Sequence, residues 1–123
     1  MNYLVKHIYN NKDNILVRKF TGSVNMTDVI NSWQEDLDNQ TVHKNLKGVI
    51  TDFTECKNNA TINELNKIVA FYKKNNHIFK HIKLAVVLDT PNVVILLMFE
   101  DIYSEIHHKA FSTYDAALAW VKK

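Results

Sequence analysis

The segment that most restricts the fold is "IKLAVVLD", residues 82–89, which is apolar at nearly every position. A strand with one face in water alternates apolar and polar side chains, whereas a strand covered on both faces is apolar almost throughout. Residues 82–89 are therefore expected to form a central parallel strand that is covered on both faces.

Segments typical of strands and of helices alternate along the rest of the chain. Residues 3–9 and 15–21 are rich in β-forming residues, and the turn sequence "NNKDN" between them predicts a hairpin. Further strands are predicted at residues 46–53, 82–89 and 106–111, with apolar residues at helical spacing between strands. The predicted fold class is α/β, with a five-stranded, mostly parallel sheet led by the N-terminal hairpin and with four helices.

Polar residues mark the starts of the predicted helices. Asn25 and Asp28 stand three positions apart at the expected start of the first helix, which is the spacing of a capping pair. Ser112 and Asp115 have the same spacing at the expected start of the last helix. The third helix is expected at residues 91–103. The core is expected at the apolar positions of the central strands and the facing helices, namely Val49, Ile50, Ile68, Phe71, Leu84, Val86, Val87, Leu118 and either Trp120 or Val121.

The third predicted helix is apolar on more than one side, because residues 93–99 are seven consecutive apolar residues. A helix facing one core normally shows an apolar stripe with polar residues between. Neighbouring helices therefore cover this helix fully, or one side of it belongs to a homodimer, partner or ligand surface, where Met98 would be an adaptable contact.

Composition sets the broad class of the protein. A chain of 123 residues with 46% hydrophobic and 23% charged residues has the size and composition of one folded domain, expected to span residues 1–123. The net charge of +2 is too balanced to indicate a nucleic-acid partner. The single cysteine, Cys56, favours the cytoplasm, and no apolar run approaches the ~20 residues that stable membrane insertion requires.

Motifs for cofactors and metals are missing from the sequence. Two glycines and one proline cannot supply a Rossmann fingerprint or a P-loop, so no cofactor is expected. His107 and His108 are adjacent in a predicted strand and must point to opposite faces. His77 and His81 are four apart, but in a segment that we interpret as a helix-to-strand connection, so no metal site is expected.

Other residues with chemical potential have ordinary interpretations. Asp52 and Asp89 end predicted strands, where carboxylates commonly act as caps and turn formers. Cys56 has no signature of a catalytic nucleophile around it. The lysines at positions 73, 74, 80 and 83 are interpreted as a solvated connection. No enzymatic activity is expected.

Three stretches resemble a known family. "GVITDF", "KLAVVLDTP" and "AFSTYDAALAWVKK" are similar to the central strand, the next strand and the closing strand and helix of the SpoIIAA-like family, stand-alone STAS-type domains of bacteria. The resemblance implies a SpoIIAA-like β-α superhelix. It also implies regulation through protein contacts, switched in better understood STAS domains by phosphorylation of a Ser or Thr after the third strand.

Thr61 occupies the position that the resemblance gives to the phosphoacceptor. Its neighbours Ala60, Ile62 and Asn63 differ from the family's Asp-Ser-x-Gly-like motif. "TINE" is also a capping box, in which the Thr61 hydroxyl would bond the amide of Glu64, whose side chain would bond the Thr61 amide. The sequence therefore offers Thr61 as a candidate phosphoacceptor or helix cap, and the capping box favours the structural role.

The expected function is that of a non-enzymatic regulatory or protein-interaction domain in the cytoplasm. Its partner would be another protein, which the sequence does not identify, or a second copy of the chain in a homodimer. The alternative is a small apolar-ligand or lipid-binding carrier, since distant relatives of this fold class bind apolar molecules beside the sheet.

Overall fold

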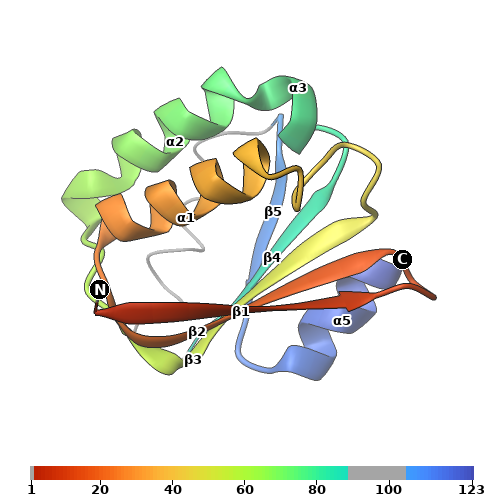
Figure 1. The fold of residues 1–123 in the computed structure, drawn as a ribbon, viewed down its shortest axis with the longest axis horizontal. Coiled ribbons are helices and arrows are strands. Elements are labelled where there is room, and N and C mark those ends of the chain that lie inside the picture. Colours follow the sequence, from red (N-terminus) through yellow and green to blue (C-terminus); the bar gives the residue numbers. More distant parts are fainter. Residues whose placement is uncertain (1, 89–104) are drawn as a thin grey trace.

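The computed structural model describes residues 2–88 and 105–123. These residues form a five-stranded sheet with the order β1 (Tyr3–Asn10), β2 (Ile15–Val24), β3 (Gly48–Asn58), β4 (Lys83–Val87) and β5 (His107–Phe111) (Figure 1). Strand β1 pairs antiparallel with β2, and every other neighbouring pair is parallel. The predicted α/β class, with a mostly parallel sheet led by a hairpin, is confirmed.

Helices cover both faces of this sheet. Helix α1 (Met26–Asp38), helix α2 (Leu65–Lys74) and the short helix α3 (Asn76–Phe79) lie on one face, and α5 (Tyr114–Lys122) lies on the other (Figure 1). A 3-10 turn, η1 (Ile62–Glu64), precedes α2 directly. Among the described helices, none combines the length and the apolar character needed to cross a membrane.

The hydrophobic core has two parts, one on each side of the sheet. The larger core packs the sheet against α1 and α2, and the residues at its centre include Phe20, Trp33, Val49, Leu65, Ile68, Phe79 and Leu84. The smaller core lies under α5 and consists of Ile15, Val17, Ile50, Ala85, Val87, Ala117 and Val121. Alternate residues of β4 and of the first half of β3 enter different cores, so these segments are buried on both faces.

The predicted core residues are buried, with differences in the last helix. The strand and α2 residues predicted for the core are all buried, namely Val49, Ile50, Ile68, Phe71, Leu84, Val86 and Val87. In α5, Val121 is fully buried, whereas Trp120 and Leu118 are only partly buried against the core. Val121, rather than Trp120, is thus the inward residue of the two alternatives.

Strands β2 and β3 are longer than the sequence predicted. The strand predicted at residues 46–53 continues through the mostly polar residues 54–58, which pair with β2 as far as the Val24–Asn58 pair. Strand β2, predicted at residues 15–21, continues through Gly22 to Val24. Gly22 has a φ of 95°, and a Cβ atom there would collide with the Asn2 carbonyl, so glycine lets the strand pass close to the N-terminal segment.

One predicted helix cap is confirmed, and another lies one residue away from its predicted position. The capping box of α1 is confirmed, because Asn25 and Asp28 each accept a hydrogen bond from the other's backbone amide. The prediction for the last helix was wrong by one residue, since Thr113, not Ser112, accepts from the Ala116 amide. The predicted helix at residues 91–103, with Met98 and the apolar run 93–99, lies outside the described residues.

Candidate functional site

The candidate phosphoacceptor Thr61 lies in the link between β3 and α2. Its side chain is exposed. The Glu64 carboxylate accepts hydrogen bonds from the Thr61 amide at 3.1 Å and from the Thr61 hydroxyl at 3.0 Å. The Glu64 amide donates instead to the Thr61 carbonyl at 3.0 Å. Half of the predicted capping box is therefore present, but the Thr61 hydroxyl donates to the carboxylate rather than capping an amide.

The residues before Thr61 fix this link to the end of β2. The Asn59 amide donates to the Val24 carbonyl at 2.7 Å, and the Asn59 side chain donates to the Ser23 hydroxyl at 2.9 Å. The Asn58 side chain accepts from the Ala60 amide at 2.9 Å. We call residues 58–65 the Thr61 segment. Its hydrogen bonds hold the Thr61 hydroxyl at one defined position on the surface.

A cavity of about 60 Å³ lies beneath the Thr61 segment, between the sheet and helices α1 and α2. Val29 and Trp33 of α1, Ile68 and Tyr72 of α2, and His108 of β5 contribute to its wall. The Thr61 segment contributes Asn58, Ala60 and Leu65. The cavity and the candidate phosphoacceptor thus share one piece of backbone, which neither the sequence spacing nor the resemblance indicated.

Polar side chains in the cavity wall are few and uncharged at neutral pH. Thr51 of β3 is 2% exposed, and its hydroxyl oxygen has no hydrogen-bond partner among the described residues. Burial lowers the pKa of His108 to about 4, so its imidazole is neutral near pH 7. Burial likewise raises the pKa of Tyr72, which keeps its phenol protonated. The cavity is consequently an apolar space with a single unsatisfied hydroxyl among the groups described.

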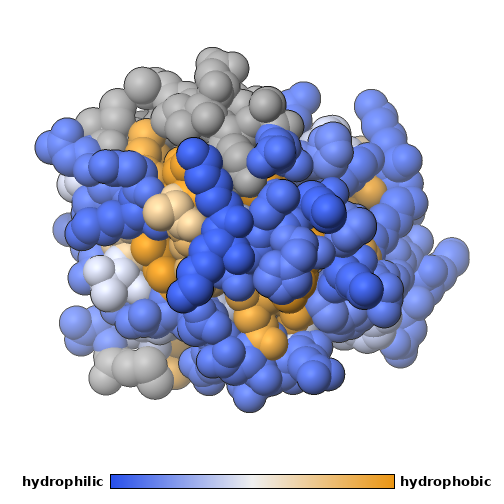
Figure 2. All heavy atoms as spheres, turned by 90° about the horizontal axis from the view of Figure 1, so that it is seen from above, coloured by the Kyte–Doolittle hydropathy of each residue, from blue (hydrophilic) through white to orange (hydrophobic). Residues whose placement is uncertain are grey.

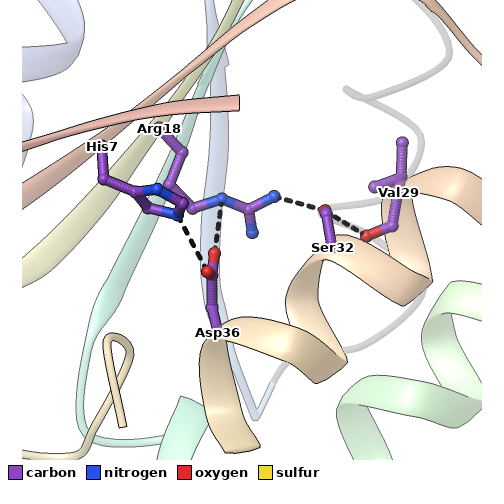
Figure 3. A network of polar contacts seen from close by, with 5 residues as sticks. All are labelled: His7, Arg18, Val29, Ser32 and Asp36. Carbon is purple, nitrogen blue, oxygen red and sulfur yellow. Dashed lines mark hydrogen bonds and ion pairs between the residues drawn. The ribbon is translucent and has the colours of Figure 1, made fainter. Parts of the chain in front are cut away.

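A buried polar network lies next to the larger core and joins β1, β2 and α1 (Figure 3). The Arg18 guanidinium donates from Nη2 to the Ser32 hydroxyl at 2.7 Å, and its Nε lies 3.3 Å from Asp36 Oδ2. His7 Nε2 lies 2.8 Å from Asp36 Oδ1. Arg18 also stacks on the ring of Trp33, with 3.7 Å between Cζ and the ring centroid. The network clamps α1 onto the first two strands.

The network was missed in the sequence, although a signal for it exists. Arg18 alternates with Leu16 and Phe20 along β2, and all three point toward the larger core. Trp33 and Asp36 stand three apart and share one face of α1. Burial lowers the pKa of Arg18 to about 10, so the guanidinium remains charged in the core at neutral pH.

The remaining sequence candidates lie apart from this site. Asp52 is buried and lies within β3, so the prediction that it ends a strand was wrong; its carboxylate accepts from the Thr54 amide at 2.8 Å. Asp89 lies outside the described residues. Burial raises the pKa of the Cys56 thiol, which disfavours the reactive thiolate. His77 and His81 are both exposed. No three His, Cys, Asp or Glu side chains of the described part gather as metal ligands.

Two solved structures resemble this one over nearly the whole chain. One is an uncharacterised protein of the DUF3478 family from Shewanella loihica PV-4 with a SpoIIAA-like fold; it has a TM-score of 0.64 and 15% identity, and the match covers 98% of this chain and 94% of that chain. The other is an anti-sigma factor antagonist from Mycobacterium paratuberculosis, with a TM-score of 0.59, 18% identity, and coverage of 98% and 96%.

Sequence comparison adds no further assignment, since no family model matches the chain and no curated protein matches it significantly. At these identities the structural likeness establishes the architecture. The β-α arrangement that the sequence resemblance implied is confirmed: this chain has the SpoIIAA-like fold.

Proposed function

We propose that this protein is a non-enzymatic regulatory domain of the cytoplasm that binds a protein partner through the Thr61 segment. The observation that carries this proposal is the exposed Thr61 hydroxyl, held against Glu64 at the start of α2. The STAS resemblance gives that position to the phosphoacceptor. The shared fold with an anti-sigma factor antagonist supports a regulatory role.

Phosphorylation of Thr61 would change this surface through local electrostatics. A phosphate carries about −1.5 to −2 charges at neutral pH, and it would lie beside the Glu64 carboxylate that now accepts from the Thr61 hydroxyl. Repulsion between the two would break that contact. Lys67, whose Nζ lies 3.8 Å from Glu64 Oε2, is the nearby cation to which the phosphate would turn.

The test is a quantitative co-purification from the source cell, with tagged wild-type protein and surface variants. Asn59→Arg and Thr61→Asp alter the Thr61 segment. Lys12→Glu, in the turn between β1 and β2, is a matched control at the other end of the hairpin (Figure 1). We expect one protein to be recovered with the wild type and Lys12→Glu, and to be reduced at least tenfold with Asn59→Arg.

The response of Thr61→Asp separates a switch from a helix cap. A switch predicts that Thr61→Asp changes partner recovery and that phosphopeptide mapping of the native protein finds modified Thr61. A cap predicts unchanged recovery and unmodified Thr61. Equal recovery with Asn59→Arg and the wild type would contradict the proposal that this segment binds the partner.

The apolar cavity favours a second candidate function, a carrier of a small apolar ligand or lipid. Seen from the helical side, the surface is largely polar, with smaller apolar areas between the polar side chains (Figure 2). Native mass spectrometry of protein purified from its source tests this candidate. A retained lipid-sized mass supports a lipid carrier, and a bare protein mass contradicts it.

A further inference from the structure

The cavity under the Thr61 segment has a definite size, and that size restricts what can enter it. Its volume is about 60 Å³. An engineered apolar cavity of ~150 Å³ holds one benzene molecule, and sites for drug-sized ligands occupy roughly 300–1,000 Å³. The present cavity therefore accommodates a molecule of a few non-hydrogen atoms, and a lipid chain would have to extend beyond it.

The wall of the cavity restricts the chemistry of that molecule. The wall is mainly apolar, with Val29, Trp33, Ile68 and Val86 among the residues that line it, and no side chain that lines it in the described part carries a charge at neutral pH. A charged ligand would lose its hydration without gaining an opposite charge. The ligand is accordingly neutral, with a predominantly apolar body.

The Thr51 hydroxyl supplies the directional contact. Thr51 lies in the middle of β3, paired with Arg18 on one side and Val86 on the other, so its side chain faces the larger core with theirs. The hydroxyl oxygen is buried and has no hydrogen-bond partner among the described residues. Buried polar groups are nearly always satisfied, and a hydroxyl can donate to a carbonyl oxygen or exchange a hydrogen bond with another hydroxyl.

A water molecule is a poor occupant of this space. Buried waters usually make about three hydrogen bonds, whereas the described wall of the cavity as a whole is mainly apolar. A molecule with one polar atom matches the wall better, because its carbon atoms face the apolar residues while its oxygen faces Thr51.

We propose that this cavity is a binding site for a small neutral molecule with an apolar body and one hydroxyl or carbonyl oxygen, anchored by Thr51. The proposal rests on the second candidate function and names its ligand class. This proposal does not depend on partner binding. A failed co-purification test therefore does not contradict the ligand site, and a failed ligand test does not contradict partner binding.

Methyl and amide NMR spectra of the full chain test the proposal with three probes. Acetone offers a carbonyl on a small apolar body, xenon offers an apolar body alone, and cyclohexanone offers the carbonyl on a body too large for the cavity. We expect acetone and xenon to shift the signals of Val29, Ile68 and Val86, and cyclohexanone to leave them unchanged.

Two variants identify the anchor. Thr51→Val removes the hydroxyl and keeps the shape, and Thr51→Ser keeps the hydroxyl. Loss of one hydrogen bond is expected to weaken acetone binding about tenfold in Thr51→Val, with xenon binding unchanged. Thr51→Ser should bind acetone within a few-fold of the wild type. Acetone binding that is equal in Thr51→Val and the wild type, or no acetone shift at the cavity residues, would overturn the proposal.

Discussion

Arg18 places a positive charge inside the larger core, where an unpaired charge would strongly destabilise the fold. Its side chain is completely buried, and Asp36, Ser32 and the Trp33 ring surround the guanidinium. Asp36 in turn contacts His7, which is partly exposed. The charge is thus balanced by one carboxylate whose second oxygen reaches toward the surface. Asp36 is the residue on which the network depends.

Removing Asp36 should lower stability sharply. In Asp36→Ala the buried Arg18 loses its counter-charge, and breaking a buried ion pair in this way costs about 3–5 kcal/mol of the free energy of unfolding. Urea denaturation measures the change, with Asp38→Ala as a control on the exposed side of α1. The double variant Arg18→Met/Asp36→Leu should recover most of the loss. An Asp36→Ala protein as stable as Asp38→Ala would show that Arg18 does not need its partner.

His108 should make stability depend on pH. Its pKa is lowered by burial from 6.5 to about 4, so between these pH values the unfolded chain binds a proton that the folded chain does not. Stability therefore falls as pH decreases from 6.5 toward 4 and is unaffected by His108 above 6.5. A shift of this size corresponds to a loss of about 3 kcal/mol across the window.

The measurement is the difference in urea midpoint between the wild type and His108→Gln across that window. Glutamine keeps a polar side chain but does not titrate. The difference between the two proteins should change with pH in the stated direction. Parallel pH dependence in both proteins would assign the effect to other groups.

At the scale of elements, the start of α2 depends on Glu64 more than on Thr61. Both the amide and the hydroxyl of Thr61 donate to the Glu64 carboxylate, and α2 has no other side-chain cap. The capping-box argument alone expects Thr61→Ala to cost ~1 kcal/mol. The observed geometry predicts a smaller loss of about 0.5 kcal/mol for Thr61→Ala, because an exposed hydrogen bond contributes little.

Glu64→Ala should destabilise the protein more than Thr61→Ala, since it removes the acceptor of both bonds. Thr61→Asp should destabilise it too, because the new carboxylate lies next to Glu64. The urea midpoints of the three variants, compared with Thr61→Ser, check this order. A larger loss of stability for Thr61→Ala than for Glu64→Ala would show that the Thr61 hydroxyl is the helix cap.

The order of the elements was predictable from sequence because each element has its own pattern. The apolar β4 and the helical spacing of Ile68 and Tyr72 in α2 each indicated one structure. The end of β3 was not predictable, because residues 54–58 are polar and form a strand only by pairing with β2. Polar residues in a local window favour a turn, and the partner strand that overrides this preference lies far away in sequence.

The candidate site was predictable only in part, for a similar reason. Thr61 could be identified because the capping pattern and the family resemblance are both visible in a few consecutive residues. Among the described residues, the cavity is lined by side chains from β3, β4, β5, α1 and α2 and by Ala60 and Leu88, and Thr51 is notable only because no described neighbour bonds its hydroxyl. Such an arrangement depends on how the elements pack, which no single segment encodes.

At the scale of the whole molecule, the two faces of the sheet are covered unequally. Helix α5 packs against β3, β4 and β5, and β1 forms the edge of the described sheet. On the α5 side of β1, Leu4 is 70% exposed and Ile8 is 45% exposed. Exposed Lys6 lies between them on the same face. An edge strand with exposed apolar residues is prone to pair with another copy unless a charge interrupts it.

Lys6 should be the residue that prevents this pairing. If two β1 strands met antiparallel with Leu4 opposite Ile8 of the second copy, Lys6 of each copy would lie directly opposite the other. Like charges in directly opposite positions destabilise a strand pair. Lys6→Val removes that repulsion and adds a β-branched apolar residue, so it should promote self-association. Lys12→Val removes the same charge in the turn, where no strand pairing is possible, and should behave as the wild type.

Light scattering at increasing protein concentration measures the outcome. The average mass of Lys6→Val should rise with concentration above that of the wild type and of Lys12→Val. A homodimer formed through another surface would raise the average mass of all three proteins equally, so the difference between Lys6→Val and the other two would remain. If the average mass of Lys6→Val equals that of the wild type and of Lys12→Val at every concentration, the Lys6 charge does not prevent pairing of β1 strands. Twist or side-chain crowding of the strand must then prevent it.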